Sequence, residues 1–340
     1  MARVLVVPWS IASKAVIGEL RVVVKVSGDR RNYTVNSHNF QFSLNDGAGA
    51  CLHRWLPQGK PIASVQIIHG MAEHGARYAR LAAALTAAGY AVYAQDLPGH
   101  GRSVRSADEL GHFPQGWHGV LRAINEVRGL VEREQPDTPL FMLGHSMGSF
   151  LLQDYVIEHG AGLSGAIFSA TSGDLGPLRA VGHALMRLEA LWYGTQHASA
   201  LADTLTFKDF NRKFRPNRTE FDWLSRDNAE VDLYVADPLC GFRCGAGLWV
   251  ELLSACGRLT EPQRLGRIPQ GLPLLIIGGD HDSATRGEKG PRALERHYRK
   301  VQLRDVTARI YEGARHELLN ETCRDQVTAD LLGWLKEHRG

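Results

Sequence analysis

The sequence around residue 146 places a serine between two glycines, in the run GHSMG at residues 144–148. The apolar residues 140–143 before it are typical of a short buried strand, and apolar residues after it recur at helical spacing up to Gly160. We expect the helix to end there in a left-handed turn, a conformation that glycine adopts readily. Ser146 therefore lies at a predicted strand-to-helix corner, where the two glycines keep the strand and the helix from colliding.

A serine hydroxyl is a weak nucleophile at neutral pH unless a histidine accepts its proton and a carboxylate orients that histidine. His316 follows the last predicted strand and precedes a C-terminal helix, as expected if the chain order is serine, acid, histidine. The acid should follow the preceding strand, and both Asp280 and Asp282 do so. The spacing alone does not choose between these two aspartates.

Chemistry through such a serine also needs backbone N–H groups that stabilise a negatively charged oxygen. Met147, the residue after the serine, is one expected donor; Met71 is the other, because Gly70 allows a sharp turn after an earlier strand. His69 and His74 flank this turn, but a zinc site there would lack a third ligand. We therefore expect neither a metal ion nor an organic cofactor.

These groups must be positioned by a scaffold, and the sequence predicts one in which strands alternate with helices. Strand-like apolar runs lie at residues 63–70, 90–96, 140–143, 165–170, 272–279 and 306–311. Such alternation predicts an α/β fold with a mainly parallel sheet that helices cover on both faces. We assign this core to residues 37–171 and 263–340, with a hairpin turn near its beginning at Asn45, Asp46 and Gly47.

Residues 172–262 interrupt the alternation. They carry bulky apolar residues at helical spacing, among them Trp192 and Phe207, but no convincing strand. An insertion after the carboxyl end of a strand lies over the edge where α/β sheets bind their ligands, so we expect a helical lid. Trp192 and Phe207 are expected in the interior of this lid rather than in a substrate wall. Residues 1–36 form an N-terminal extension whose role the sequence does not indicate.

The overall composition is that of a globular protein. Of 340 residues, 44% are hydrophobic, and the net charge of +3 without a long basic run argues against a nucleic-acid partner. The five cysteines are odd in number and scattered, as expected of reduced thiols in a cytoplasmic protein. The N-terminus has a basic start and an apolar stretch, but Pro8 and the charged residues from Lys14 onward interrupt it. We therefore expect a cytoplasmic protein rather than an exported one, and no membrane-spanning segment.

Several separated stretches of the chain resemble a known family. They are HGMAEHGARY at 69–78, DLPGHGRS at 96–103, GHSMG at 144–148, SRDNAEVDLYVADPLC at 225–240, GGDHD at 278–282 and YEGARHELLNE at 311–321. The chain from about residue 38 to residue 338 thereby resembles the monoacylglycerol lipase and lysophospholipase branch of the α/β-hydrolases, which is often grouped with serine aminopeptidases. The resemblance implies an α/β-hydrolase fold in which the insertion is a cap that admits acyl chains.

The resemblance also implies roles for individual residues. Gly279 and Asp282 fit the G-x-x-D pattern of this branch, which implies that Asp282 is the acid and that Asp280 is a loop or supporting residue. It implies the backbone amides of Met71 and Met147 as the oxyanion donors. Ser149 departs from the pattern, because many members of the family have glycine at this position, and we expect it to affect the packing under the nucleophile.

Residues and resemblance together predict a serine carboxylic ester hydrolase, an esterase or lipase. In this interpretation His316 deprotonates Ser146, the serine attacks an ester carbonyl, and water then releases the acyl group. The expected partner is a small acyl ester or a lipid, and the lid allows a transient contact with a membrane surface.

Three alternatives use the same scaffold. An aminopeptidase or amidase would need an acid to bind a free amine; Glu230, Asp232 and Asp237 are candidates, although we expect these acids to hold the lid in place. An acyltransferase would differ only in that an alcohol outcompetes water as the acceptor. A binding protein without activity would be expected to lack a member of the triad, and the sequence lacks none.

Overall fold

The computed structural model describes residues 20–24, 33–44, 49–173, 175–176 and 178–340. Its centre is a nine-stranded sheet in the order β1-β2-β3-β5-β4-β6-β7-β8-β9. The strands are β1 (Leu20–Val24), β2 (Tyr33–Ser43), β3 (Gly49–Leu56), β4 (Ala63–Ile68), β5 (Tyr90–Gln95), β6 (Leu140–His145), β7 (Gly165–Ser169), β8 (Leu274–Gly279) and β9 (Val306–Tyr311). The pairs from β5 to β9 in this order are parallel, whereas β1, β2, β3 and β5 pair antiparallel.

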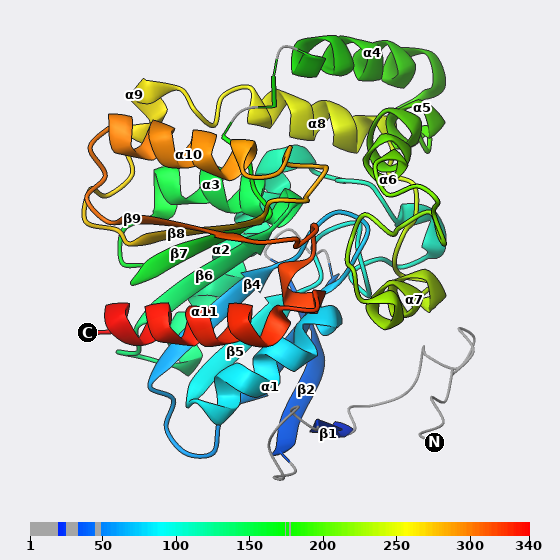
Figure 1. The fold of residues 1–340 in the computed structure, drawn as a ribbon. Coiled ribbons are helices and arrows are strands. Elements are labelled where there is room, and N and C mark those ends of the chain that lie inside the picture. The colour runs from blue at the N-terminus through cyan, green and yellow to red at the C-terminus, as the bar shows by residue number, and fades with distance from the viewer. Residues whose placement is uncertain (1–19, 25–32, 45–48, 174, 177) are drawn as a thin grey trace.

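Helices cover both faces of the sheet (Figure 1). The α-helices of the described residues are α1 (Ala79–Ala87), α2 (Gly116–Glu134), α3 (Met147–His159), α4 (Leu178–Tyr193), α5 (Ala200–Asp203), α6 (Asp209–Arg212), α7 (Asn228–Ala236), α8 (Ala246–Cys256), α9 (Pro262–Leu265), α10 (Lys289–Lys300) and α11 (Arg324–His338). Side chains of α1 and α11 pack on one face, and those of α2, α3 and α10 pack on the other. This arrangement confirms the predicted α/β-hydrolase fold.

The apolar runs of the sequence form these layers because their side chains alternate between the two faces. In β4, where every residue is buried, Val65 and Ile67 pack with α1 and α11, while Ile68 packs with α2 and α3. α2 contributes an apolar stripe that includes Trp117, Val120, Ile124, Val127 and Val131. Burying each such side chain contributes roughly 1.5–3 kcal/mol, which fixes the strands and the turns at their ends.

The beginning of the sheet differs from expectation, and the predicted hairpin turn is not tested. The sheet includes β1 and begins β2 at Tyr33, so part of the predicted extension at residues 1–36 belongs to it. β2 and β3 pair as expected of a hairpin, with Ser43 opposite Gly49, but the predicted turn at 45–47 lies outside the described residues. β2 mixes polar with apolar residues, which gives a weaker sequence pattern than a buried parallel strand does.

The end of α3 is also formed differently. Gly160 follows the helix with φ −68° and ψ −21°, which is right-handed, so the predicted left-handed turn at this residue is wrong. The positive φ, 81°, occurs two residues later at Gly162. The N–H of Leu163 donates to the carbonyl of Gly160, so the chain makes one further turn before it reverses.

Between β7 and β8 the described residues form α4 to α9 and no strand of the sheet. Phe207 packs in an aromatic cluster, as expected, but Trp192 is 79% exposed, so its predicted place in the interior is wrong. The reason is that α4 packs mainly on α8, and its opposite face carries apolar side chains that no described element covers. Among the described helices, none combines the length and the apolar character that crossing a membrane requires.

Candidate active site

Ser146 stands at a tight turn between β6 and α3, with φ 51° and ψ −119°. A Cβ on Gly144 would lie 2.4 Å from the carbonyl oxygen of Gly148, and one on Gly148 would lie 2.2 Å from that of Ile68. Glycine is therefore required on both sides because β6, α3 and the end of β4 approach so closely. A non-glycine residue at positive φ costs about 1–3 kcal/mol, so the surrounding structure must hold the serine in place.

Ser146, His316 and Asp282 lie in one hydrogen-bonded chain at the carboxyl ends of β6, β9 and β8. His316 Nε2 is 2.9 Å from Ser146 Oγ, and His316 Nδ1 is 2.8 Å from Asp282 Oδ2. The backbone N–H of Ala284 donates to the other oxygen of Asp282 at 2.9 Å. Asp280 is turned elsewhere, with Oδ1 2.7 Å from Nδ1 of the exposed His281. Of the two aspartates that the sequence left open, Asp282 is thus the one at the histidine.

The negative charges around His316 stabilise the protonated form of its imidazole. Burial lowers the pKa of His316, but the charge and hydrogen bond of Asp282, together with the charges of Glu317 and Glu73, outweigh it and hold the pKa above its ordinary value. Burial raises the pKa of Asp282, but the charge of His316 and hydrogen bonds from His316 and Ala284 hold it below its ordinary value. The pair can therefore hold a proton on the imidazole beside an ionised carboxylate.

Two backbone amides are predicted as oxyanion donors. That of Met147 directly follows the nucleophile in the sequence, and that of Met71 lies in the loop after β4. In the described part of the protein, the N–H groups of Met71 and Met147 have no hydrogen-bond acceptor. The N–H of Gly70, by contrast, donates to Glu73 Oε1 at 2.6 Å. This leaves the Met71 and Met147 amides available to a ligand, as an oxyanion hole requires.

A buried charge network, which we did not predict, joins the loop after β4 to the loop that carries His316. Arg77 donates to both oxygens of Glu317, at 2.6 and 2.7 Å, and to Glu73 at 2.6 Å. The side chains of Arg77, Glu73 and Glu317 are only 11%, 5% and 6% exposed. Glu73 also accepts a hydrogen bond from the hydroxyl of Tyr78. All four residues lie within the motifs that carry the family resemblance, but no spacing rule indicates the contact between Arg77 and Glu317, which are 240 positions apart.

The later part of the insertion is bonded to both of these loops. The N–H of Glu317 donates to the carbonyl of Leu224 at 2.8 Å, and the hydroxyl of Tyr234 donates to the carbonyl of Ala72 at 2.9 Å. The acids considered above for an amine all contact a basic side chain: Glu230 and Asp232 form ion pairs with Arg80 and Arg218, and Asp237 Oδ2 lies 2.9 Å from His74 Nε2. These contacts hold residues 224–237 against the loops after β4 and β9.

Aromatic side chains of the insertion pack directly on His316. The ring of Trp223 lies 4.7 Å from that of His316, and Phe207 stacks on Trp223 with ring centres 5.7 Å apart and an interplanar angle of 15°. Helical spacing had indicated that Phe207 is buried, but nothing in the sequence indicated that Trp223 contacts the histidine. An apolar surface therefore adjoins the reactive atoms.

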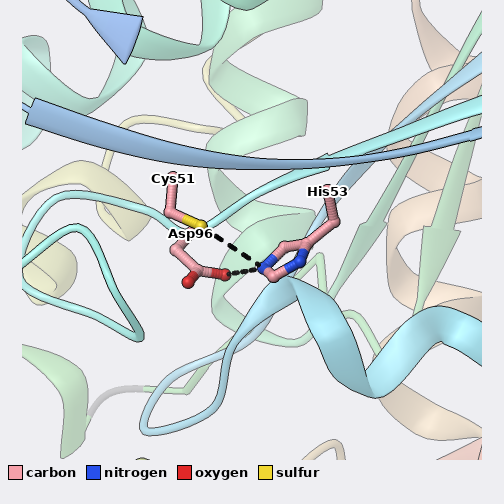
Figure 2. A group of neighbouring side chains, drawn as sticks. All are labelled: Cys51, His53 and Asp96. Atoms are coloured by element: carbon pink, nitrogen blue, oxygen red, sulfur yellow. Dashed lines mark hydrogen bonds and ion pairs between the residues drawn. The ribbon is translucent and has the colours of Figure 1, made fainter. Parts of the chain in front are cut away.

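Cys51 and His53 of β3, together with Asp96 directly after β5, form a cluster of possible metal ligands (Figure 2). His53 Nε2 lies 4.0 Å from Cys51 Sγ and 2.9 Å from Asp96 Oδ1. The Asp96 carboxylate also accepts the N–H groups of Gly75, at 2.8 Å, and Arg102, at 2.7 Å. Burial, helped by Asp96, raises the pKa of Cys51 to about 12, whereas a metal needs the thiolate. These groups fit a structural link between β3 and two loops better than a metal site.

Comparisons with known proteins agree with this geometry. Residues 59–323 match the profile of the family described as serine aminopeptidase, S33. The monoglyceride lipase of Mus musculus is 30% identical over 295 residues, which cover 84% of this chain and 85% of that one. The monoacylglycerol lipase of Mycolicibacterium smegmatis is 29% identical over 290 residues, covering 84% and 91%. A highly thermostable carboxyl esterase from Bacillus coagulans has a similar structure, with a TM-score of 0.82 and 25% identity over 89% of this chain and 99% of that one.

The family match spans most of the chain and includes the segments that carry Ser146, Asp282 and His316. The relatives confirm the predicted class of enzyme, a carboxylic ester hydrolase of the serine esterase and lipase type. The chain belongs to the serine aminopeptidase S33 family of α/β-hydrolases.

Proposed function

We propose that the protein hydrolyses monoacylglycerols or closely related lipid esters through an acyl-enzyme on Ser146. The observation that carries this proposal is the continuous hydrogen-bonded chain from Ser146 Oγ through His316 to Asp282. In this proposal Ser146 is the nucleophile, His316 the general base and acid, and Asp282 the residue that orients the imidazole. The amides of Met71 and Met147 bind the oxyanion.

The reaction proceeds in two halves. As Ser146 Oγ bonds to the ester carbonyl carbon, its proton passes to His316 Nε2, and the carbonyl electrons move onto the oxygen held by the two amides. The tetrahedral intermediate then breaks its bond to the alcohol oxygen, which takes the proton from His316. Water repeats the sequence on the acyl-enzyme, releasing a fatty acid and restoring the Ser146 hydroxyl.

The choice of lipid esters rests on two observations. The curated relatives reported above are named for monoglycerides or monoacylglycerols, and the esterase from Bacillus coagulans was solved in complex with glycerol. In this chain, Trp223 packs on His316 and is backed by Phe207, so an aromatic cluster adjoins the reactive atoms, which suits an apolar acyl chain. We propose that the insertion at residues 172–262 acts as the lid or cap over this site.

Substitution of the nucleophile tests the proposal. Ser146→Ala is expected to abolish turnover of p-nitrophenyl esters and monoacylglycerols, and to abolish covalent labelling by a fluorophosphonate, without changing the melting temperature greatly. Ser64→Ala, a buried serine in β4, is the matched control and should keep full activity. Residual turnover in S146A close to that of the wild type would exclude Ser146 as the nucleophile.

A substrate panel separates the ester reaction from the aminopeptidase alternative that the family description suggests. The acids Glu230, Asp232 and Asp237 are already engaged by basic side chains, so a substrate amine would have to displace them. We therefore expect kcat/KM for monoacylglycerols to exceed that for aminoacyl anilides by orders of magnitude. Faster turnover of the anilides would contradict the proposed substrate class, and formation of a glyceryl ester in the presence of excess glycerol would reveal acyl transfer.

We also propose that α4 docks transiently on a lipid surface. It exposes Leu188, Leu191, Trp192 and Tyr193, whose side chains are 55%, 80%, 79% and 69% exposed. Replacing Leu191 and Trp192 by serine should weaken co-sedimentation with phosphatidylcholine vesicles, whereas Leu233→Ser, an equally apolar exposed position on α7, should not. Unchanged sedimentation of the α4 variant would rule this surface out.

We also propose that the protein is located in the cytoplasm. Five cysteines with free thiols support this location, and fractionation of cells that produce the protein would test it.

A further inference from the structure

A chain of buried side chains behind the nucleophile ends on the backbone of Ser146. Gln153 Nε2 lies 2.7 Å from Thr171 Oγ1, which lies 2.8 Å from Ser149 Oγ, and Ser149 Oγ lies 2.6 Å from the carbonyl oxygen of Ser146. Gln153, Thr171 and Ser149 are at most 1% exposed. Ser149 is the residue at which the sequence departs from the family resemblance, which implies glycine.

The available protons allow only one donor-to-acceptor direction along this series of hydrogen bonds. The Ser146 carbonyl only accepts, so the one proton of the Ser149 hydroxyl points to it. The Thr171 hydroxyl must therefore donate to Ser149, because Ser149 has no second proton. Gln153 Nε2 donates to Thr171 and also lies 3.3 Å from the carbonyl of Ser172, which fixes the amide nitrogen rather than the oxygen on this side. Each bond polarises the next toward the Ser146 carbonyl.

The peptide group at the end of this chain is the one that carries the Met147 N–H. In a trans peptide the carbonyl of one residue and the N–H of the next are fixed in one plane and point in opposite directions. A donor that holds the Ser146 carbonyl thus sets the direction of the Met147 N–H, and drawing electron density onto that oxygen makes the N–H a better donor. The amides of Ser149 and Phe150 also donate to this carbonyl, at 2.8 and 3.3 Å, so the hydroxyl adds a third donor to an existing pair.

The chain also joins two strained turns. Ser146 and Ala170 both have a φ of 51°, although neither is glycine. The N–H of Ser146 donates to the carbonyl of Ser169 at 2.9 Å, and Thr171, directly after Ala170, supplies the hydroxyl of the chain. The N–H of Ala170 donates to the carbonyl of Ile277 at 2.9 Å, so both turns are held by bonds to neighbouring strands. Residues in a rarely populated conformation persist only where the surroundings over-determine them.

We propose that Ser149, Thr171 and Gln153 are positioning residues that orient and polarise the Met147 amide as an oxyanion donor. This inference rests on the proposed function, because it assigns the Met147 N–H to the tetrahedral intermediate. A donor of this kind stabilises the transition state rather than the bound substrate, so its loss lowers kcat and leaves KM unchanged.

The test uses Ser149→Ala, Thr171→Val and Thr171→Ser in the full-length protein. S149A and T171V each break the chain and should slow the pre-steady-state burst of p-nitrophenol by about five- to tenfold, the size of one hydrogen bond. Both should weaken a trifluoromethyl ketone, which forms a tetrahedral adduct with a serine, by the same factor at unchanged KM. T171S keeps the hydroxyl and should restore the wild-type rate. The double variant S149A/T171V should be no slower than the slower single variant, because the chain is already broken.

Two matched controls separate this effect from a general loss of stability. Ser64→Ala removes a buried hydroxyl in β4, and Thr86→Val removes a buried hydroxyl that bonds to Ala82 within α1. Both should leave the burst rate unchanged whatever they do to the melting temperature. Burst rates of S149A and T171V within twofold of the wild type would overturn the inference, as would a slow S149A beside a normal T171V. Failure of the proposed function itself would appear separately, as turnover by S146A.

Discussion

Replacing Arg77 with methionine removes a cation that contacts two buried carboxylates next to His316. The substitution nearly preserves the length of the side chain but leaves Glu73 and Glu317 without their shared partner. Glu73 keeps the Gly70 N–H and the Tyr78 hydroxyl as donors, and Glu317 keeps the Asn320 side-chain amide. The two carboxylates then repel one another in a region from which water is largely excluded.

The expected magnitude follows from this burial. Removing one partner of a buried ion pair costs about 3–5 kcal/mol, whereas an exposed pair is worth about 0–1 kcal/mol. The three side chains are 11%, 5% and 6% exposed and three of their contacts are 2.7 Å or shorter, so Arg77 falls in the first class. We therefore expect R77M to lose about 3–5 kcal/mol of unfolding free energy at pH 7, a large share of the roughly 5–15 kcal/mol that a typical domain possesses.

The loss should depend on pH in a defined direction. Burial raises the pKa of Glu73, but Arg77 and other neighbours lower it to about 2; the pKa of Glu317 is likewise held below its ordinary value against burial. A carboxylate of this kind contributes stability that is fully present above its unfolded pKa of about 4.3 and disappears as the pH falls toward the folded value. Without Arg77 the folded-state pKa values rise, so the deficit of R77M should be largest near neutral pH and should shrink as the pH is lowered.

Denaturant unfolding followed by tryptophan fluorescence measures this deficit, and Arg54→Met supplies the control. Arg54 also binds a carboxylate through two contacts, to Glu134 at 2.8 and 3.0 Å, but these side chains are 25% and 28% exposed. R54M should therefore cost about 1 kcal/mol or less. In a double-mutant cycle, R77M/E317Q should cost less than the sum of the single variants by about 1 kcal/mol or more. A deficit of R77M no larger than that of R54M, or strict additivity in the cycle, would refute the reasoning.

The remaining predictions concern catalysis. Glu317→Gln removes a charge that raises the pKa of His316, so the acidic limb of the kcat/KM profile should move to lower pH; a limb that stays in place or moves up would contradict this. Asp282→Asn should lower kcat by roughly 10⁴ through loss of the correct imidazole tautomer, while Asp280→Asn should stay within about twofold, and the reverse result would make Asp280 the acid. Trp223→Leu should lower kcat/KM more for long-chain monoacylglycerols than for p-nitrophenyl acetate, and an equal change for both would exclude a role in acyl binding.

Much of the scaffold could be predicted because buried parallel strands are continuous apolar runs. The apolar run at 140–143 and the serine after it indicated both a strand and a turn, and the turn needs glycines for reasons of local space. Local signals were less informative where two nearby glycines could end a helix: the positive φ occurs at Gly162 rather than at Gly160. Apolar residues at helical spacing indicated helices in the insertion, but this spacing gives no information on which element covers their apolar side chains, and Trp192 is exposed.

Contacts between segments that lie far apart along the chain could not be predicted from the sequence. Arg77 and Glu317 are 240 positions apart, and no spacing rule relates them. Trp223 reaches His316 only because the loops after β4 and β9 bind the insertion on two sides. The choice of Asp282 over Asp280 required the family pattern. Both aspartates lie on one loop after β8, and their spacing does not show which side chain points toward His316.

Ser146 and His316 meet across 170 positions of the chain, and the strand before the histidine, β9, is the last of the sheet. Contacts of such long range close late in folding, because the entropy of ordering the intervening chain must be lost before they form. A refolding molecule can thus regain most of its helices and strands before it regains a nucleophile. Recovery of ester turnover, measured beside recovery of helical circular dichroism, would time the docking of the final strand rather than the collapse of the chain.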